Sequence, residues 1–247
     1  MIVFKTSMIK RSIIHKLLMQ KEDFMRNYSI AIDGPAGAGK STIAKLIAKK
    51  LGYIYIDTGA MYRAMGLYLI RKQISLENDE SINKACERVN ISIAFEQGEQ
   101  QVILNGENVT SLIRTPEASH MASSCSVKQA IREKLVELQQ KLALATSVVM
   151  DGRDIGTKVL PHADLKIYLT ANSLVRAKRR YDEMIAKGEE CKLEEIEAAI
   201  IDRDERDMNR EISPLCQAKD AVLVDTSDMT IDQVVDKIID LFNLNIK

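Results

Sequence analysis

The sequence of 247 residues lacks tryptophan, has only four prolines and four cysteines, and carries no net charge. Its 35 basic and 35 acidic residues give no general attraction to nucleic acid or to a membrane surface, so anion binding must depend on a few placed side chains. No apolar run approaches the ~18 residues of a membrane-spanning helix. The cysteines lie far apart with no C-x-x-C pair, which favours reduced thiols over disulfides or zinc. We therefore expect a cytoplasmic protein without nucleic-acid or membrane partners, and we expect a monomer because no exposed apolar seam is evident in the sequence.

The first 24 residues differ in composition from the rest of the chain. They are basic and apolar, with no acidic residue before Glu22. A transit peptide is one interpretation of this composition. The other is a start codon assigned too far upstream, because Met25 begins a segment that enters a strand almost at once. We favour the second interpretation, expect residues 1–24 to be disordered or untranslated, and leave them out of the fold prediction.

Short apolar runs alternate with helical patterns along most of the chain. Strand, helix, strand, helix is the order of a parallel sheet flanked by helices, so the sequence predicts an α/β fold. Apolar residues that fall on one helical face, such as Ile43, Ile47 and Leu51, support the prediction of helices between the strands. The expected strands cover residues 28–33, 53–57, 147–151, 165–170 and 221–225, and the expected helices cover residues 41–51, 61–70, 127–145, about 174–187 and about 193–210.

The pattern changes between residues 85 and 124. Residues 90–95 and 101–104 have the character of short strands joined through Gln97-Gly98, and Asn105-Gly106 is a strong hairpin-turn signal. A small antiparallel patch inside a parallel α/β protein indicates an inserted lobe. We therefore expect a core made of residues 25–84 and 125–247, with residues 85–124 as the insert.

A phosphate-binding loop follows the first expected strand. Its sequence fits G-x-x-x-x-G-K-[ST] and stands between a strand and a helix, the context that the motif requires. Backbone N–H groups and the helix N-terminus would surround the phosphates, Lys40 would reach the β and γ phosphates, and the Ser41 hydroxyl would bind Mg²⁺. The loop residues, which we expect to bind ATP, are Gly34, Pro35, Ala36, Gly37, Ala38, Gly39, Lys40, Ser41 and Thr42.

Two further segments narrow the class of P-loop protein. A GTPase would carry N-K-x-D after a later strand, but Asn83-Lys84 continues with Ala-Cys. Residues 148–151 are similar to a Walker B strand, but Gly152-Arg153-Asp154 follows directly. We interpret this segment as an arginine-bearing loop beside the phosphates rather than as a simple metal-holding aspartate.

Arginines recur where the chain leaves the expected strands. The carboxyl ends of parallel strands form the usual ligand edge of such sheets, and arginine suits phosphate oxygens better than lysine does. The clustering therefore predicts an anionic acceptor. Arg63 follows the second strand, Arg153 follows the third, and Arg176, Arg179 and Arg180 follow the fourth.

The last long helix carries charged residues at its carboxyl end. Ile200, Arg203, Asp207 and Arg210 share one helical face, which is apolar at first and then ionic. Such a face either lines a cleft or carries a ladder in which Arg203, Asp207 and Arg210 pair among themselves. The two interpretations are compatible, because the charges of an unliganded cleft often pair.

The residue types also bear on the acceptor group. Transfer to a hydroxyl benefits from a general base, whereas a monophosphate oxygen is already anionic and needs positioning and charge shielding. Many arginines without an obvious base favour a phosphate acceptor. Asp33 and Asp57 remain candidates for a base.

Six segments taken together resemble bacterial-type cytidylate kinases, which are P-loop nucleoside monophosphate kinases. They are IDGPAGAGKST (32–42), DTGAMYRA (57–64), IRTPEAS (113–119), DGRDIGT (151–157), RDERDMNREISPL (203–215) and DTS (225–227). They run in order from about Ser29 almost to the end of the chain. The resemblance implies transfer of the γ-phosphoryl group from Mg²⁺-ATP to CMP or dCMP, giving CDP or dCDP and ADP.

The resemblance also implies roles for individual residues. Arg63 and Arg153 would hold the CMP phosphate, and Arg210 would bridge toward the transferred group, so that Lys40, Arg153 and Arg210 form the catalytic set. Further roles follow from the same likeness: Ser123, Arg132 and Asp154 would read the cytosine, Arg203 and Asp207 would hold the ribose, and Thr58 would lie beside the acceptor. A mobile helical lid at about 174–190 would bring Arg176, Arg179 and Arg180 over ATP, and the insert would be the monophosphate-binding lobe.

Cytosine recognition by these residues is physically reasonable. The Asp154 carboxylate can accept a hydrogen bond from the amino group, and Arg132 can donate to the ring acceptors. Uracil has a carbonyl in place of the amine, so we expect a preference for CMP and dCMP over UMP. Two other hypotheses for the function remain open: a P-loop kinase for UMP or another small acceptor, or an ATP-binding regulatory module.

Overall fold

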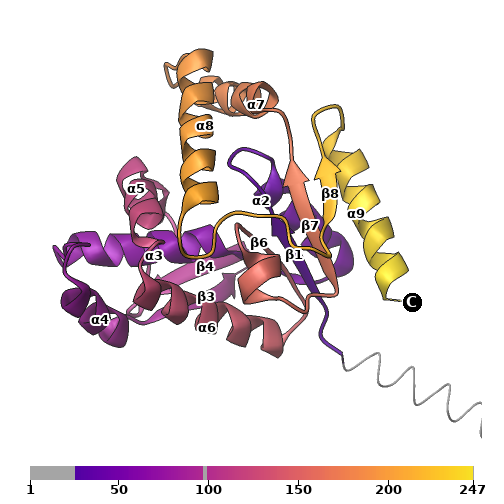
Figure 1. The fold of residues 1–247 in the computed structure, drawn as a ribbon. Coiled ribbons are helices and arrows are strands. Elements are labelled where there is room, and N and C mark those ends of the chain that lie inside the picture. Colours follow the sequence, from indigo (N-terminus) through magenta and orange to yellow (C-terminus); the bar gives the residue numbers. More distant parts are fainter. Residues whose placement is uncertain (1–25, 97–98, 247) are drawn as a thin grey trace, which may run out of the picture.

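The computed structural model describes residues 26–96 and 99–246, and its centre is a parallel sheet (Figure 1). Within these residues the sheet has five strands in the order β2-β6-β1-β7-β8, and every pairing is parallel. This confirms the predicted α/β class, and each predicted strand is present to within one residue at either end. The strands are β1 (Ser29–Asp33), β2 (Ile54–Asp57), β6 (Val148–Gly152), β7 (Leu165–Thr170) and β8 (Val222–Asp225).

Helices α2 (Lys40–Leu51) and α9 (Ile231–Asn245) cover one face of the sheet. The apolar positions of α2 pack with those of α9 against Ile32 and Val149 of the sheet. Helix α9 begins with a capping box in which Thr230 and Gln233 exchange side-chain and backbone hydrogen bonds. Burial of one apolar stripe from each helix is what fixes this layer.

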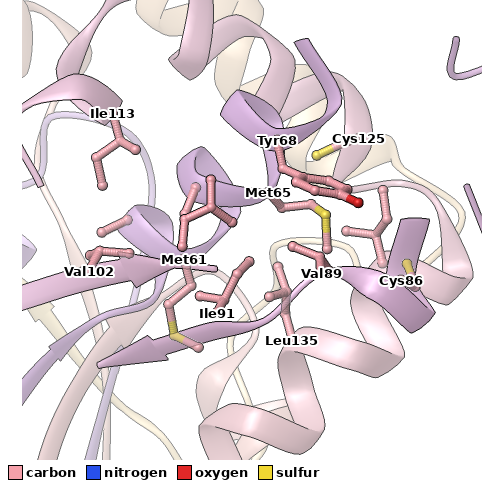
Figure 2. Packing of buried hydrophobic residues seen from close by; sticks show 14 of the residues in the cluster. Met61, Met65, Tyr68, Cys86, Val89, Ile91, Val102, Ile113, Cys125 and Leu135 are labelled. Carbon is pink, nitrogen blue, oxygen red and sulfur yellow. The ribbon is translucent and has the colours of Figure 1, made fainter. Parts of the chain in front are cut away.

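The opposite face packs against a larger cluster that includes α3 (Thr58–Arg71) and α6 (Gln129–Ala145). Figure 2 shows Met61, Met65 and Leu135 in this cluster. The sequence predicted that this helix begins at residue 127, but Val127 precedes α6 and is 44% exposed. That expectation was wrong because Lys128 is the residue at the N-cap, so the helical spacing starts later.

Two helices of this layer were not predicted. Helix α4 (Asp79–Arg88) starts at Asn78, whose side chain accepts a hydrogen bond from the Ser81 N–H. Helix α5 (Pro116–Cys125) starts at Thr115, whose hydroxyl accepts from the Ala118 N–H, with proline in the first turn. The boundaries expected for the insert, 84/85 and 124/125, therefore both fall within helices.

A second, antiparallel sheet follows α4. It contains β3 (Ile91–Glu96), β4 (Glu99–Leu104) and β5 (Glu107–Asn108). Asn105 and Gly106 both have positive φ, 49° and 87°, which confirms the turn predicted between β4 and β5. The Gln97-Gly98 connection and residues 1–24 lie outside the described residues.

Helices α7 (Ser173–Ala186) and α8 (Leu193–Asn209) pack together beyond the carboxyl ends of β7 and β8 (Figure 1). Both helices match the predicted ranges to within a residue. The remaining short elements are η1 (Leu112–Arg114) and a wider helical turn η2 (Ile155–Val159). In the part of the chain that the structure describes, no helix has the length and apolar character needed to cross a bilayer.

Candidate active site

The predicted phosphate-binding loop connects β1 to α2, as its motif requires. Gly34 has φ 147°, and a Cβ at this position would lie 1.9 Å from the Leu169 carbonyl oxygen, so only glycine fits here. Gly39 is the N-cap of α2 and also has a positive φ, 86°. The loop therefore presents the N-terminus of α2 to the cleft, and an anion placed there would receive backbone N–H groups and the positive end of the helix.

Lys40 is buried beneath this loop, and its Nζ donates to the Pro35 carbonyl oxygen at 2.7 Å. Burial lowers the pKa of Lys40 well below its ordinary value, and the positive charge of Arg153 lowers it further. The charges of Asp151 and Asp33 oppose this lowering of the pKa, although neither forms an ion pair with Lys40 among the described residues. A phosphate bound in the loop would add negative charge beside the buried ammonium group.

Ser41, Asp151 and Tyr55 form a hydrogen-bonded row next to the loop. The Ser41 hydroxyl donates to Asp151 Oδ2 at 2.8 Å, and the Tyr55 hydroxyl donates to Asp151 Oδ1 at 2.9 Å. Burial raises the pKa of Asp151 to about 6, with a further contribution from the charge of Asp57. Neither Asp151 nor Tyr55 is among the site residues predicted from the sequence, where the segment after residues 148–151 is interpreted as an arginine-bearing loop. An apolar strand that ends in aspartate was the available signal for Asp151.

Asp33 and Asp57, the candidate bases, already hold backbone groups. Asp33 accepts from the N–H groups of Ile155 at 2.8 Å and Gly156 at 2.7 Å, and burial raises its pKa to about 6. Asp57 accepts from the Ala60 N–H and from Arg63, both at 2.9 Å. Asp33 thus fixes the loop after β6, and Asp57 caps α3. Neither arrangement favours a role in proton abstraction.

Arg132 and Asp154 form a buried ion pair on the far side of the cleft, although they come from α6 and from the loop after β6. Arg132 Nη1 also donates to the Ser126 carbonyl oxygen at 3.0 Å, and its guanidinium lies 5.8 Å from the centroid of the Tyr62 ring. These contacts hold a carboxylate and a guanidinium side by side. The pair can present an acceptor and donors to one edge of a planar ligand.

Asp207 of α8 lies between two arginines of the cleft. Its Oδ2 accepts from Arg153 Nε at 2.9 Å, and its Oδ1 lies 3.8 Å from Arg210 Nη1. Arg203 is exposed and lines the cleft. The charged residues at the end of α8 therefore line the cleft and also form ion pairs. The principal partner of Asp207 is Arg153, which the ladder interpretation did not include.

Some guanidinium nitrogens in the cleft are buried without a hydrogen-bond acceptor. Among the described residues these include Arg63 Nε and Arg210 Nη2. Burial lowers the pKa of Arg210, and the nearby Arg132 lowers it further. Buried donors that lack acceptors are rare in folded proteins and need an explanation. An anionic ligand between these side chains would provide one.

Arg176 was expected to reach ATP, but most of its donors are already used. Its Nε donates to the Ala171 carbonyl oxygen at 2.8 Å, and its Nη1 lies 2.7 Å from the Ala36 carbonyl oxygen and 2.5 Å from Asp204 Oδ2. Asp204 Oδ1 in turn accepts from the Ala36 N–H at 2.9 Å. The Arg176–Asp204 ion pair therefore joins α7 and α8 to the phosphate loop.

The other two arginines of α7 lie nearer to solvent. Arg179 Nη2 donates to the Thr226 carbonyl oxygen at 2.7 Å, and Arg180 lies 3.4 Å from Glu183. Arg180 is half exposed, so its contact with Glu183 holds it weakly.

These groups surround one cleft of about 870 Å³. All of the sequence-predicted site residues line it except Gly34 and Pro35. Among residues 26–96 and 99–246, no group of three or more His, Cys, Asp or Glu side chains is placed to hold a metal ion. Further lining residues, not predicted, include Tyr62, Ser119, Ser126, Asp151, Met229 and Ile231.

Comparison with known proteins gives matches over most of the chain. The family model described as "Cytidylate kinase" matches residues 30–244. A cytidylate kinase from Ligilactobacillus salivarius is 50% identical over 88% of this chain and 97% of its own length, and one from Caldicellulosiruptor saccharolyticus is 51% identical over 88% and 96%. A solved structure of an uncharacterized protein from Eubacterium ventriosum aligns with a TM-score of 0.50 at 14% identity, over 88% of this chain and 99% of that one, which bears on the fold alone.

Proposed function

The chain belongs to the cytidylate kinase family, and we propose that its cleft transfers the γ-phosphoryl group of ATP to CMP or dCMP. It is a nucleoside monophosphate kinase. The observation that supports this assignment is that two ends of the cleft each carry groups suited to binding an anion. The phosphate loop with Lys40 forms one end, and arginines with unused buried donors form the other.

The donor nucleotide would occupy the loop end. Backbone N–H groups from Gly37 to Thr42 would hold the phosphates, and Lys40 would exchange its contact with Pro35 for the β and γ phosphates. Ser41 and Asp151 supply adjacent hydroxyl and carboxylate oxygens, which suit Mg²⁺, a cation usually held by few protein ligands together with substrate phosphates. When bound, Mg²⁺ would neutralise phosphate charge.

The acceptor phosphate would lie between Arg63, Arg153 and Arg210. Arg63 Nε and Arg210 Nη2 are among the buried donors that lack acceptors in the described residues, and phosphate oxygens would satisfy both. Arg153 donates to Asp207 in the structure. It would either turn toward the acceptor phosphate or contact Asp207 and the phosphate together. Thr58, whose hydroxyl donates to the Asp151 carbonyl oxygen at 2.7 Å, would lie beside the acceptor.

The base and the sugar of the acceptor would bind deeper in the same end. Asp154 would accept from the cytosine amine while Arg132 and Ser123 contact the ring acceptors, and the existing Arg132–Asp154 pair keeps these groups in place. Arg203 and Asp207 would hold the ribose. Uracil would place a carbonyl oxygen against the Asp154 carboxylate, so UMP would bind less well.

Transfer would be direct and in line, without a covalent enzyme intermediate. The acceptor oxygen is anionic, so the protein needs to align it and to shield charge rather than to remove a proton. Lys40, Arg153 and Arg210 would stabilise the charge that spreads over the transferred group. Helix α7 and the following residues to about 190 would act as a lid that brings Arg179 and Arg180 over ATP and excludes water.

Residues 85–124 would form the monophosphate-binding lobe on the 25–84 and 125–247 core. We further propose a cytoplasmic location and a monomer without nucleic-acid or membrane partners. The four unpaired thiols, of which Cys86 and Cys125 are buried, are typical of a reducing compartment.

The test is a coupled ADP-release assay with ATP, Mg²⁺ and each of CMP, dCMP, UMP, AMP and GMP. We expect fast turnover with CMP and dCMP and slow turnover with the others. UMP turned over as fast as CMP would refute the base-reading roles. ATP binding without turnover of any monophosphate would instead indicate a regulatory module.

A further inference from the structure

We infer that Tyr55 is a positioning residue for the cation that accompanies ATP, acting through Asp151 on the Ser41 hydroxyl. Its hydroxyl donates to Asp151 Oδ1 at 2.9 Å, while Asp151 Oδ2 accepts from Ser41 at 2.8 Å. The two oxygens of one carboxylate are thus held by two donors from different elements. The inference rests on the proposed Mg²⁺-ATP site.

The sheet register explains how Tyr55 reaches Asp151. Strand β2 pairs with β6 so that Tyr55 is opposite Val149 and Asp57 is opposite Asp151. These four residues share one face of the sheet, the face that α2 covers, because side chains alternate along a strand. Asp151 is therefore the diagonal neighbour of Tyr55, a separation that an aromatic side chain can span.

Helix α2 closes the other side of this row. Ser41 and Lys45 are one turn apart on α2, and Lys45 Nζ lies 5.6 Å from the centroid of the Tyr55 ring. The ring is thus held between the sheet and Lys45 while its hydroxyl contacts Asp151. A rigid aromatic side chain fixed at both ends can restrict the rotamer of the carboxylate.

The consequence for the cation follows from the direction of the hydrogen bonds. Ser41 donates its only hydroxyl proton to Asp151, so the lone pairs of Ser41 Oγ are left for the cation. An Asp151 carboxylate that has lost the Tyr55 contact can rotate away, and the Ser41 hydroxyl then loses its orientation. Groups that orient metal ligands typically contribute 10- to 100-fold to metal affinity or activity.

The chain supplies a matched control for a substitution at Tyr55. Tyr53 lies two residues earlier, and its ring packs in contact with Tyr28 and Phe242. In the described part of the chain its hydroxyl makes no hydrogen bond to a protein group. Tyr53→Phe and Tyr55→Phe therefore remove the same atom from neighbouring positions, and only the second removes a contact with Asp151.

The experiment measures equilibrium binding of a fluorescent ATP analogue, first with excess Mg²⁺ and then with EDTA, without any acceptor. For Tyr55→Phe we expect affinity in Mg²⁺ to fall by about 10-fold or more, with affinity in EDTA within about twofold of the wild type. Tyr53→Phe should match the wild type in both conditions. Equal losses with and without Mg²⁺ would overturn the inference, because they would mean a distorted phosphate loop rather than a misplaced cation ligand.

A second measurement guards against a folding defect. The thermal midpoint of Tyr55→Phe should stay within a few degrees of that of Tyr53→Phe, because both variants keep the ring. Unchanged affinity in Mg²⁺ would also overturn the inference. Since no monophosphate is present, the result does not depend on which acceptor the kinase uses.

Discussion

Replacing Asp204 with alanine should lower the free energy of unfolding of the protein and weaken its binding of ATP. Asp204 and Arg176 are each only 8% exposed at their side chains, and their ion pair contacts both the N–H and the carbonyl oxygen of Ala36 in the phosphate loop. Removing one partner of a buried ion pair leaves an uncompensated charge and costs about 3–5 kcal/mol. For a chain of this size, that corresponds to a thermal midpoint lower by about 10 °C.

Glu205→Ala is the matched control, because Glu205 is the next residue of α8 and is exposed. It removes a carboxylate from the same helix and should change the midpoint by less than about 2 °C. At temperatures well below the transition, Asp204→Ala should raise the KM for ATP more than the KM for CMP, because Ala36 belongs to the donor end of the cleft. Equal thermal midpoints for Asp204→Ala and Glu205→Ala would refute the stabilising role of the Arg176–Asp204 ion pair.

A double variant separates a lost ion pair from a general packing defect. Arg176→Leu/Asp204→Leu removes both charges, so it should be less destabilised than the sum of the two single leucine variants by about 1 kcal/mol or more. Additive losses in denaturant unfolding would contradict the reasoning, since they would show that the two side chains do not stabilise one another.

Three further predictions concern the cleft and the loop after β6 that Asp33 holds. Asp154→Asn should lower kcat/KM for CMP by about 10- to 100-fold and narrow the CMP-to-UMP ratio, as measured by steady-state kinetics; an unchanged value for CMP would rule out the role of Asp154. Lys40→Ala should lower kcat by about 100-fold or more while the folded state persists by circular dichroism, and substantial remaining activity would count against the loop assignment. Asp33 has its pKa raised from 3.8 to about 6 in the fold, so its contribution to the free energy of unfolding is largest below pH 4 and falls by about 3 kcal/mol as pH rises through 6. Denaturant unfolding of the wild type and Asp33→Asn from pH 4 to pH 7 should show this difference, and parallel pH profiles would refute it.

Much of the core was predictable because its signals are local. The alternation of apolar runs predicted the strands of the sheet, and the phosphate-loop motif stands between β1 and α2 as expected. The Asn105-Gly106 turn was predictable for the same reason, since its positive φ values suit those residue types. Helices α4 and α5 were missed although Asn78 and Thr115-Pro116 are ordinary helix starts. The sequence prediction for this part of the chain used only the strand and turn signals between residues 90 and 106, so it contained an antiparallel patch and no helix.

The contacts of the cleft depend on distances that a sequence does not contain. Arg176 and Asp204 are 28 positions apart, and nothing in either segment indicates that Asp204 accepts from the Ala36 N–H. The same holds for Tyr55, whose hydroxyl meets Asp151 only because β2 and β6 pair in one register. The residue types predicted which groups lie at the ligand edge of the sheet. The ion-pair partner of each charged group could be identified only from the structure.

The most direct test of the central claim is ³¹P NMR of the purified protein with ATP, Mg²⁺ and CMP. The account predicts that CDP and ADP form in equal amounts, with little inorganic phosphate, because the γ-phosphoryl group passes to the phosphate of CMP and water is excluded. Release of inorganic phosphate without CDP, or no consumption of ATP, would contradict it.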